Sequence, residues 1–263
     1  MTDPGIGRGV LRPTAAAARY ELLRQDPAAD LAAQVEFHWI VRWDLRGRAP
    51  HVQKVLSHPN VHLVFEEPRP TVYGVQRGVF SRRLSGAGRV LGTKFRPGAF
   101  RPLLGSPVAA LADRAVPAAE LFGPAVTEAG RAVLGAAEPA GMAALAEEFL
   151  RSVLPEPHPV AREVADIVAL ITEAPALLRV DQVAAACGLS VRTLQRLFAE
   201  YVGASPKWVL RRARLHEAAT RAEEGAGIDW AALAADLGYA DQAHLVRDFT
   251  ATVGSPPARY ARH

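Results

Sequence analysis

The sequence has one cysteine among 263 residues, only two methionines and three lysines, and no long hydrophobic run. A single Cys187 excludes an intramolecular disulfide and a cysteine-based zinc site, and it suits a reducing compartment. No apolar stretch approaches the ~18 residues that cross a bilayer, and the first residues lack the apolar core of a secretory signal. We therefore expect a cytoplasmic protein with no membrane-spanning segment.

The overall composition is typical of a globular protein of two domains. Hydrophobic residues make up 49% and charged residues 22%, with a formal net charge of +4. The stiff segment Pro155-Glu-Pro-His-Pro159 cannot continue a helix, and it is the best candidate for a domain boundary. The predicted domains are residues 1–155 and residues 160–263.

The first domain is predicted to be rich in β-strands. From Val35 the pattern alternates, with one set of side chains on each face of the strand. One face has Phe37, Trp39, Val41 and Trp43, and the other has Glu36, His38, Ile40 and Arg42. Similar runs at 61–66, 71–75 and 89–95, separated by turn signals, predict an antiparallel barrel or sandwich.

Ala-rich helical segments follow the strands, so the fold class of the whole chain is predicted to be α+β. The helix expected over 141–154 has an apolar stripe that could pack on the barrel or on a second subunit. If the barrel binds a small molecule, the wall of its site is predicted to include His38, Trp39, Arg42 and Trp43.

The second domain contains a duplication. Gly188 to Gly203 reads GLSVRTLQRLFAEYVG, and Gly238 to Gly254 reads GYADQAHLVRDFTATVG. The closing glycines lie 51 positions apart and the opening glycines 50 apart, so the second copy has one extra residue between them. In each copy a short helix, a glycine turn and a second helix predict a helix-turn-helix unit.

The second helix of the first unit has the chemistry of a base reader. Ser190 is the expected N-cap and Gly203 the expected end of the helix. Arg192, Gln195 and Arg196 share the polar face, and Arg and Gln can bind guanine and adenine with two hydrogen bonds each in the major groove. The alternative is that these three side chains only form a solvent-exposed helix face. The duplication of the motif favours base reading over this alternative.

The linker and the second unit supply the other predicted DNA contacts. A helix from Pro206 to about Arg221 is expected to join the units, with Arg211 and Arg212 at phosphates. In the second unit, Asp229 is the expected cap of the first helix. The groove-facing candidates of that unit are Gln242, His244 and Arg247. Asp241 and Asp248 make this copy acidic, so the first copy is expected to read more of the bases.

These motifs resemble the DNA-binding domain of AraC/XylS-type transcriptional regulators. The resemblance rests on Gly188-Leu-Ser with Leu194-Gln-Arg-Leu-Phe198 and on Gly238-Tyr with His244-Leu-x-Arg-x-Phe249. It implies two helix-turn-helix units with a central linker helix, and base or backbone contacts at the six groove-facing residues named above. The N-terminal half more weakly resembles the small β-rich domain ahead of this domain in many actinobacterial-type regulators, and this resemblance implies a cupin-like architecture.

The resemblance makes a transcription factor the leading functional hypothesis, with double-stranded promoter or operator DNA as its partner. A small-molecule effector, RNA polymerase and a second copy of the chain are further candidate partners. One alternative is a cupin-type metal-dependent enzyme fused to a DNA binder, suggested by His38, His51, His58 and His62. The His-x-His-plus-Glu spacing of such a site is missing, so no enzyme, cofactor or metal is expected. Another alternative is a DNA-binding protein without an effector.

Overall fold

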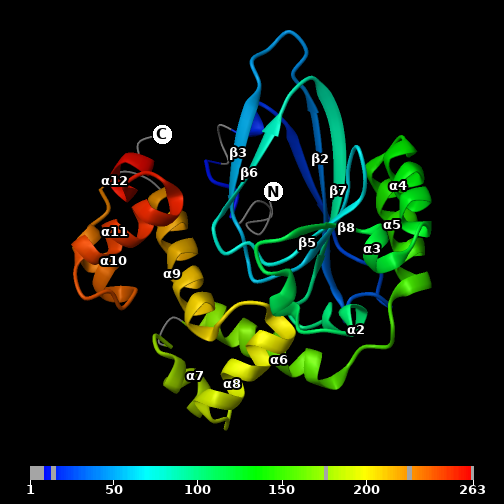
Figure 1. The fold of residues 1–263 in the computed structure, drawn as a ribbon. Helices are drawn as coiled ribbons and strands as arrows, with labels where there is room; N and C mark the ends of the chain where they lie inside the picture. The colour runs from blue at the N-terminus through cyan, green and yellow to red at the C-terminus, as the bar shows by residue number, and fades with distance from the viewer. Residues whose placement is uncertain (1–8, 13–15, 175–176, 224–226, 262–263) are drawn as a thin grey trace.

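The computed structural model describes residues 9–12, 16–174, 177–223 and 227–261. β-Strands occupy the N-terminal part of the chain and helices occupy the C-terminal part (Figure 1). This confirms the α+β class, with an antiparallel β-domain followed by an all-helical domain. Within the described residues, no helix has the length and apolar character needed to cross a bilayer.

Two antiparallel sheets make up the β-domain. Within the described residues the larger sheet has, in spatial order, β1 (Glu21–Gln25), β2 (Val35–Asp44), β7 (Ala87–Phe95), β4 (His62–Phe65), β5 (Thr71–Tyr73) and β8 (Ala115–Pro117). A second sheet pairs β3 (His51–Leu56) with β6 (Val79–Leu84). Figure 1 shows β3 and β6 on one side of the larger sheet and the helices of this domain on the other.

The alternation expected from Val35 is confirmed by β2, which pairs with β7 along almost its whole length. Trp39 lies opposite Gly92 and Trp43 lies opposite Gly88. A Cβ atom at Gly92 would lie 2.0 Å from the Trp39 ring, and one at Gly88 would lie 2.4 Å from the Trp43 ring. The two glycines therefore let the indole rings lie against the β7 backbone.

Helices cover the opposite face of the larger sheet. The main ones are α4 (Ala125–Gly135) and α5 (Pro139–Val153), preceded by α2 (Arg101–Leu104), the 3₁₀ helix η1 (Val108–Leu111) and α3 (Ala119–Phe122). Met142 and Phe149 of α5 are buried with Ile40, Leu91 and other sheet residues in the largest core. The apolar stripe of α5 thus packs on the sheet of its own chain.

The helical domain begins at α6 (Pro159–Glu173) and contains two helix-turn-helix units. The first has α7 (Val180–Ala186), α8 (Val191–Leu197) and a π-helical turn η2 (Phe198–Val202). The second has α10 (Trp230–Asp236), α11 (Gln242–Val253) and α12 (Pro257–Tyr260). The helix α9 (Pro206–Glu223) joins them, and at ~1.5 Å per residue its 18 residues span about 27 Å.

Each unit has its own apolar core, and the β-domain contributes side chains to both. Val75, in the connection between β5 and β6, is fully buried in the core of the first unit. Leu11 and Leu56 are buried in the core of the second unit. The two domains are therefore docked through apolar contacts as well as polar ones.

Polar contacts join the same surfaces. Arg101 forms an ion pair of 2.6 Å with Glu200 of the π-helical turn. At the second unit, the Arg12 backbone N–H donates to the Tyr260 hydroxyl at 3.0 Å, and the His58 and His216 rings stack with centroids 4.0 Å apart. The β-domain therefore contacts both helix-turn-helix units.

Candidate functional site

The turns of the two helix-turn-helix units have the same backbone geometry. Gly188 has φ +66° and Gly238 has φ +68°, a left-handed conformation that glycine adopts without steric cost. In the first turn the Leu189 N–H donates to the Ala184 carbonyl at 2.8 Å, and in the second the Tyr239 N–H donates to the Ala234 carbonyl at 2.9 Å. These pairs lie 50 positions apart, so the copies superpose through the turn.

The caps of the second helices show where the extra residue is placed. The Ser190 hydroxyl accepts from the Thr193 N–H at 3.1 Å, which confirms the predicted cap. Asp241 accepts from the His244 N–H at 2.6 Å. These caps lie 51 positions apart, so the additional residue lies between Gly238 and Asp241. From the caps onward, each residue of α8 corresponds to the residue 51 positions later in α11.

The polar face of α8 is open. Arg192, Gln195 and Arg196 are all exposed, and none has a hydrogen-bond or ion-pair partner among the described residues. Leu194 and Phe198 are fully buried beneath them. The apolar stripe therefore fixes the helix on the domain and leaves two guanidinium groups and one amide directed away from it.

The equivalent face of α11 is also open but differs in chemistry. Gln242, His244 and Arg247 are exposed. The His244 ring packs edge-on against Tyr239 with a centroid distance of 5.1 Å. In the alignment by caps, Arg247 corresponds to Arg196. These two arginines are the cations that both units present at the same helical position.

The acidic residues of α11 have structural roles that the sequence pattern did not indicate. Asp241 is the N-cap of the helix. Asp248 forms an ion pair with Arg211 of α9 and accepts a hydrogen bond of 2.9 Å from the Tyr239 hydroxyl. The Asp248 side chain is only 10% exposed, so its charge is directed into the domain. The Asp248 charge is therefore compensated by Arg211, whereas Asp241 is exposed at the start of α11. The weaker base reading expected of the second unit stays a prediction.

Both linker arginines predicted to contact phosphates have hydrogen-bond partners within the protein. Arg211 pairs with Asp248, and this hydrogen bond raises the pKa of its guanidinium. Arg212 is 3% exposed and lies over the Trp208 ring, 4.6 Å from the ring centroid. Arg212 is buried against the β-domain, so in this conformation its guanidinium is not available to a phosphate. Arg211 is exposed and paired within the helical domain, and its phosphate contact stays a prediction.

Arg212 belongs to the contact between the domains. Its Nη2 donates to the Arg77 carbonyl at 2.6 Å, and Trp208 Nε1 donates to the same oxygen at 3.3 Å. Burial, with the neighbouring Arg211 charge, lowers the Arg212 pKa to about 10. Arg77 is held by Asp113 at 2.6 Å. The connection between β5 and β6 is therefore bonded to α9 immediately beside the buried Val75.

The four residues predicted to line a ligand site lie on two different faces of the larger sheet. Trp39 and Trp43 face the side of β3 and β6 and pack on Gly92 and Gly88, whereas His38 and Arg42 point to the other side. His38 is fully buried and Arg42 is exposed. The prediction that all four side chains line one wall of a ligand site was wrong, because successive residues of a strand point to opposite faces of the sheet.

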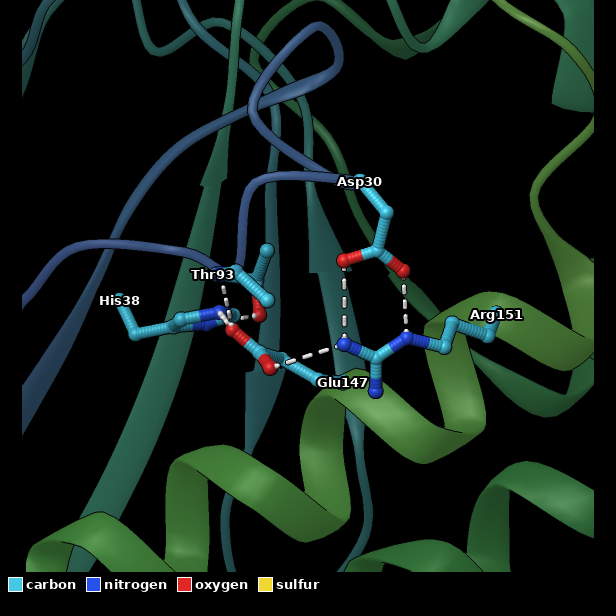
Figure 2. A network of polar contacts seen from close by, with 6 residues as sticks. Asp30, His38, Thr93, Glu147 and Arg151 are labelled. Atoms are coloured by element: carbon cyan, nitrogen blue, oxygen red, sulfur yellow. Dashed lines mark hydrogen bonds and ion pairs between the residues drawn. The ribbon is translucent and has the colours of Figure 1, made fainter.

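His38 takes part in a polar network between the sheet and α5 that is buried at His38 and Thr93 and reaches the surface at Asp30 and Arg151 (Figure 2). Its Nδ1 lies 3.0 Å from the Thr93 hydroxyl and its Nε2 lies 3.4 Å from a Glu147 oxygen. Arg151 links Glu147 to Asp30, with the Arg151–Asp30 ion pair at 2.6 Å. Burial lowers the His38 pKa despite the Glu147 carboxylate, which raises it. The network ties the start of the β-domain to its last helix.

On the Trp39 face, the structure adds polar residues that the sequence pattern did not indicate. Trp39 Nε1 donates to His62 Nδ1 at 3.1 Å. Lys94, opposite His62 in the sheet, donates to Glu36 at 2.8 Å and lies over the Phe37 ring. No sequence signal places His62 beside Trp39, because they lie on strands that pair with β7 rather than with each other.

The four histidines of the metal-enzyme alternative lie in four separate places. His38 contacts Glu147, His51 packs near Tyr20, His58 stacks on His216 and His62 accepts from Trp39. In the part of the chain that the structure describes, no three His, Cys, Asp or Glu side chains lie close enough together to hold a metal ion.

The stability of the β-domain should fall in mild acid. Burial and the neighbouring Lys94 charge lower the His62 pKa to about 3, so the unfolded state binds the proton more readily. Stability conferred by neutral His62 is therefore lost as the pH falls below ~6.5. Urea denaturation should show a decrease of about 2 kcal/mol in unfolding free energy between pH 7 and pH 5.

The matched variant for this pH dependence is His62→Gln, whose side-chain oxygen can still accept from Trp39. It should fold and should show a shallower loss of stability between pH 7 and pH 5. An unchanged slope in the variant would contradict the assignment to His62.

Comparison with protein families finds one match in the β-domain and one in the helical domain. Residues 183–263 match a helix-turn-helix domain family, and residues 23–117 match a domain of unknown function, DUF6597. Comparison with curated proteins finds no significant match. The helix-turn-helix match covers both second helices, α8 and α11, and the whole of α9 between them.

The full chain also shows similarity in fold to solved structures of ToxT from Vibrio cholerae. A structure from strain O395 has 8% identity and a TM-score of 0.41, covering 93% of this chain and 96% of that chain. The unsaturated fatty acid bound wild-type ToxT from strain SCE256 has 7% identity and a TM-score of 0.38, covering 96% and 92%. These similarities are too low to transfer a ligand to this chain.

Proposed function

We propose that the C-terminal part of the chain, of which residues 183–263 match a helix-turn-helix domain family, is a DNA-reading domain of the AraC type. The first unit presents Arg192, Gln195 and Arg196 to base edges in one major groove. The second presents Gln242 and Arg247, with His244 beside them, in another. The observation that carries the proposal is that all six side chains are exposed while the apolar stripes below them are buried.

The direct test is a titration of the full-length protein with duplex DNA. Fluorescently labelled promoter DNA from the neighbourhood of its own gene is compared with a scrambled duplex of equal composition. We expect a complex that prefers the promoter DNA and weakens steeply as salt is raised, because cationic side chains contact phosphates. Failure to form any salt-sensitive complex at low salt would falsify the proposal.

We also propose that a small molecule at the β-domain modulates DNA binding. The domain shares apolar cores with both reading units, so a change in its conformation reaches the reading helices through Val75, Leu11 and Leu56. The face that carries Trp39 and Trp43 is the proposed wall of the site. This regulation is an allosteric coupling if ligand binding and DNA affinity depend on each other.

Thermal-shift screening of metabolites against the full-length chain tests this regulation. A metabolite that raises the melting temperature and also changes DNA affinity would support coupling between two sites. Stabilisation without any effect on DNA affinity would contradict it and favour an effector-independent DNA binder.

Partners other than DNA have less support. The apolar stripe of α5 is buried inside its own chain, so it does not supply a surface for a second copy. Homodimerisation and contact with RNA polymerase therefore stay predictions. Light scattering of the protein alone and with a single-site duplex would measure how many copies bind.

A further inference from the structure

Val191 is an exposed apolar side chain on the proposed DNA-reading surface. Among the described residues, the large hydrophobic side chains classed as exposed are Val52, at 53%, and Val191, at 38%. Val191 is the first residue of α8, directly after the Ser190 cap. Its position follows the spacing of the buried stripe, three residues before Leu194 and seven before Phe198, yet 38% of its surface stays accessible. This accessible apolar surface is open to contact with another molecule.

The neighbours of Val191 belong to the proposed reading face. Arg192 is adjacent, and Gln195 lies one helical turn later, on the same side of α8. The N-terminal residues of a recognition helix are the ones that meet base edges in the major groove. An apolar group at this position would therefore meet the edge of a base if α8 enters the groove.

The second unit has a different residue at the same place. Because the caps Ser190 and Asp241 correspond, Val191 corresponds to Gln242, the first residue of α11. Both side chains are exposed. One position in two copies thus carries an aliphatic group in the first and an amide in the second.

These two chemistries suit different bases. Thymine presents its 5-methyl group in the major groove, where an apolar side chain can contact it, whereas adenine presents a donor and an acceptor that an amide can bind. We propose that Val191 contacts a thymine 5-methyl group and sets the base preference at one position of the DNA site. Gln242 sets a preference for adenine at the corresponding position read by the second unit. The inference rests on the proposed DNA-reading function.

The test uses duplexes selected by the full-length protein from a random-sequence library. Within the part read by the first unit, each thymine is replaced in turn by deoxyuridine, which lacks only the methyl group. We expect one replacement to weaken binding about fourfold, the effect of one buried methyl-sized group. At that base pair, cytosine should bind less tightly than 5-methylcytosine, because the latter restores the methyl group.

Variants assign the methyl effect to the side chain. Val191→Ala should bind the thymine and deoxyuridine duplexes with equal affinity. Val52→Ala is the matched control, because Val52 is an exposed valine on β3, and it should keep the full difference. Val191→Gln should shift the selected base from thymine towards adenine, as at the Gln242 position.

The results separate this inference from the function on which it rests. A protein that selects a defined site but is insensitive to every deoxyuridine replacement would overturn the role of Val191 alone. The same holds if Val191→Ala keeps the methyl sensitivity of the unmodified protein. Failure to select any site from the library would instead overturn DNA reading as a whole.

Discussion

Replacing Arg196 and Arg247 together by alanine should abolish sequence-specific DNA binding by the full-length protein. The two residues correspond by their positions after the caps and are exposed on α8 and α11. A bidentate arginine–guanine contact contributes ~1–3 kcal/mol of discrimination, and distant sites act additively. The double variant should therefore lose roughly 2–6 kcal/mol, or about 30-fold to more than 10⁴-fold in affinity for its selected site.

The single variants show whether both units read bases. Each should relax the base preference at one position and leave the other position unchanged. Arg131→Ala, at an exposed arginine on α4 of the β-domain, is the control and should bind as the unmodified protein does. If Arg247→Ala has no effect on base preference, the second unit does not read through this residue. A uniform loss across all sequences would instead identify phosphate contacts.

Replacing Val75 by aspartate should separate the β-domain from the first helix-turn-helix unit. Val75 is fully buried among apolar side chains of α6, η2 and α9. An uncompensated buried charge typically costs about 3–5 kcal/mol, so we expect the variant to undock rather than bury the carboxylate. The Arg77 carbonyl would then lose its bonds to Trp208 and Arg212.

Undocking can be measured separately from loss of fold. Urea denaturation should change from a joint transition to separate transitions of the two domains, and Trp208 emission should shift towards that of exposed tryptophan. Val52→Asp is the matched control and should change stability by less than about 0.5 kcal/mol, because Val52 is exposed on β3. A single transition and unchanged emission in Val75→Asp would contradict the role of this contact.

The helical domain was predictable because its signals are local. Ser190 and Asp229 cap helices at the expected positions, and Gly203 ends its helix with φ +86°. Each of these signals depends on residues within one or two helical turns. The π-helical last turn of the first unit was not expected; it lies where η1 of the β-domain packs against η2, a contact that local sequence signals do not indicate.

The β-domain was predicted less completely. The strand β2 has clear alternation, whereas β3 has buried Gln53 at a core position, satisfied by the Leu11 and Lys54 carbonyls. The partner strand β6 has adjacent Arg82 and Arg83, which obscure any period-two pattern. The residues that pair between these strands lie about 30 positions apart in the sequence. The spacing of residue types within each strand therefore does not predict which strand it pairs with.

The errors in the predicted sites have two physical origins. Helical periodicity places Arg212 on an exposed side of an isolated α9, but it does not indicate which surfaces another domain covers. The charge of Asp248 is compensated by Arg211, which is 37 positions away on another helix and so not indicated by local spacing. The predicted ligand site has a different error, because alternation within one strand already separates His38 from Trp39.

The burial of Arg212 between the domains also affects how many cations DNA binding releases. The Arg212 guanidinium cannot neutralise a phosphate while the domains are docked. Each further phosphate that the protein neutralises steepens the logarithmic dependence of affinity on salt by about 0.9. A ligand that loosens docking should therefore release Arg212 and steepen the salt dependence of DNA affinity before it changes any base preference.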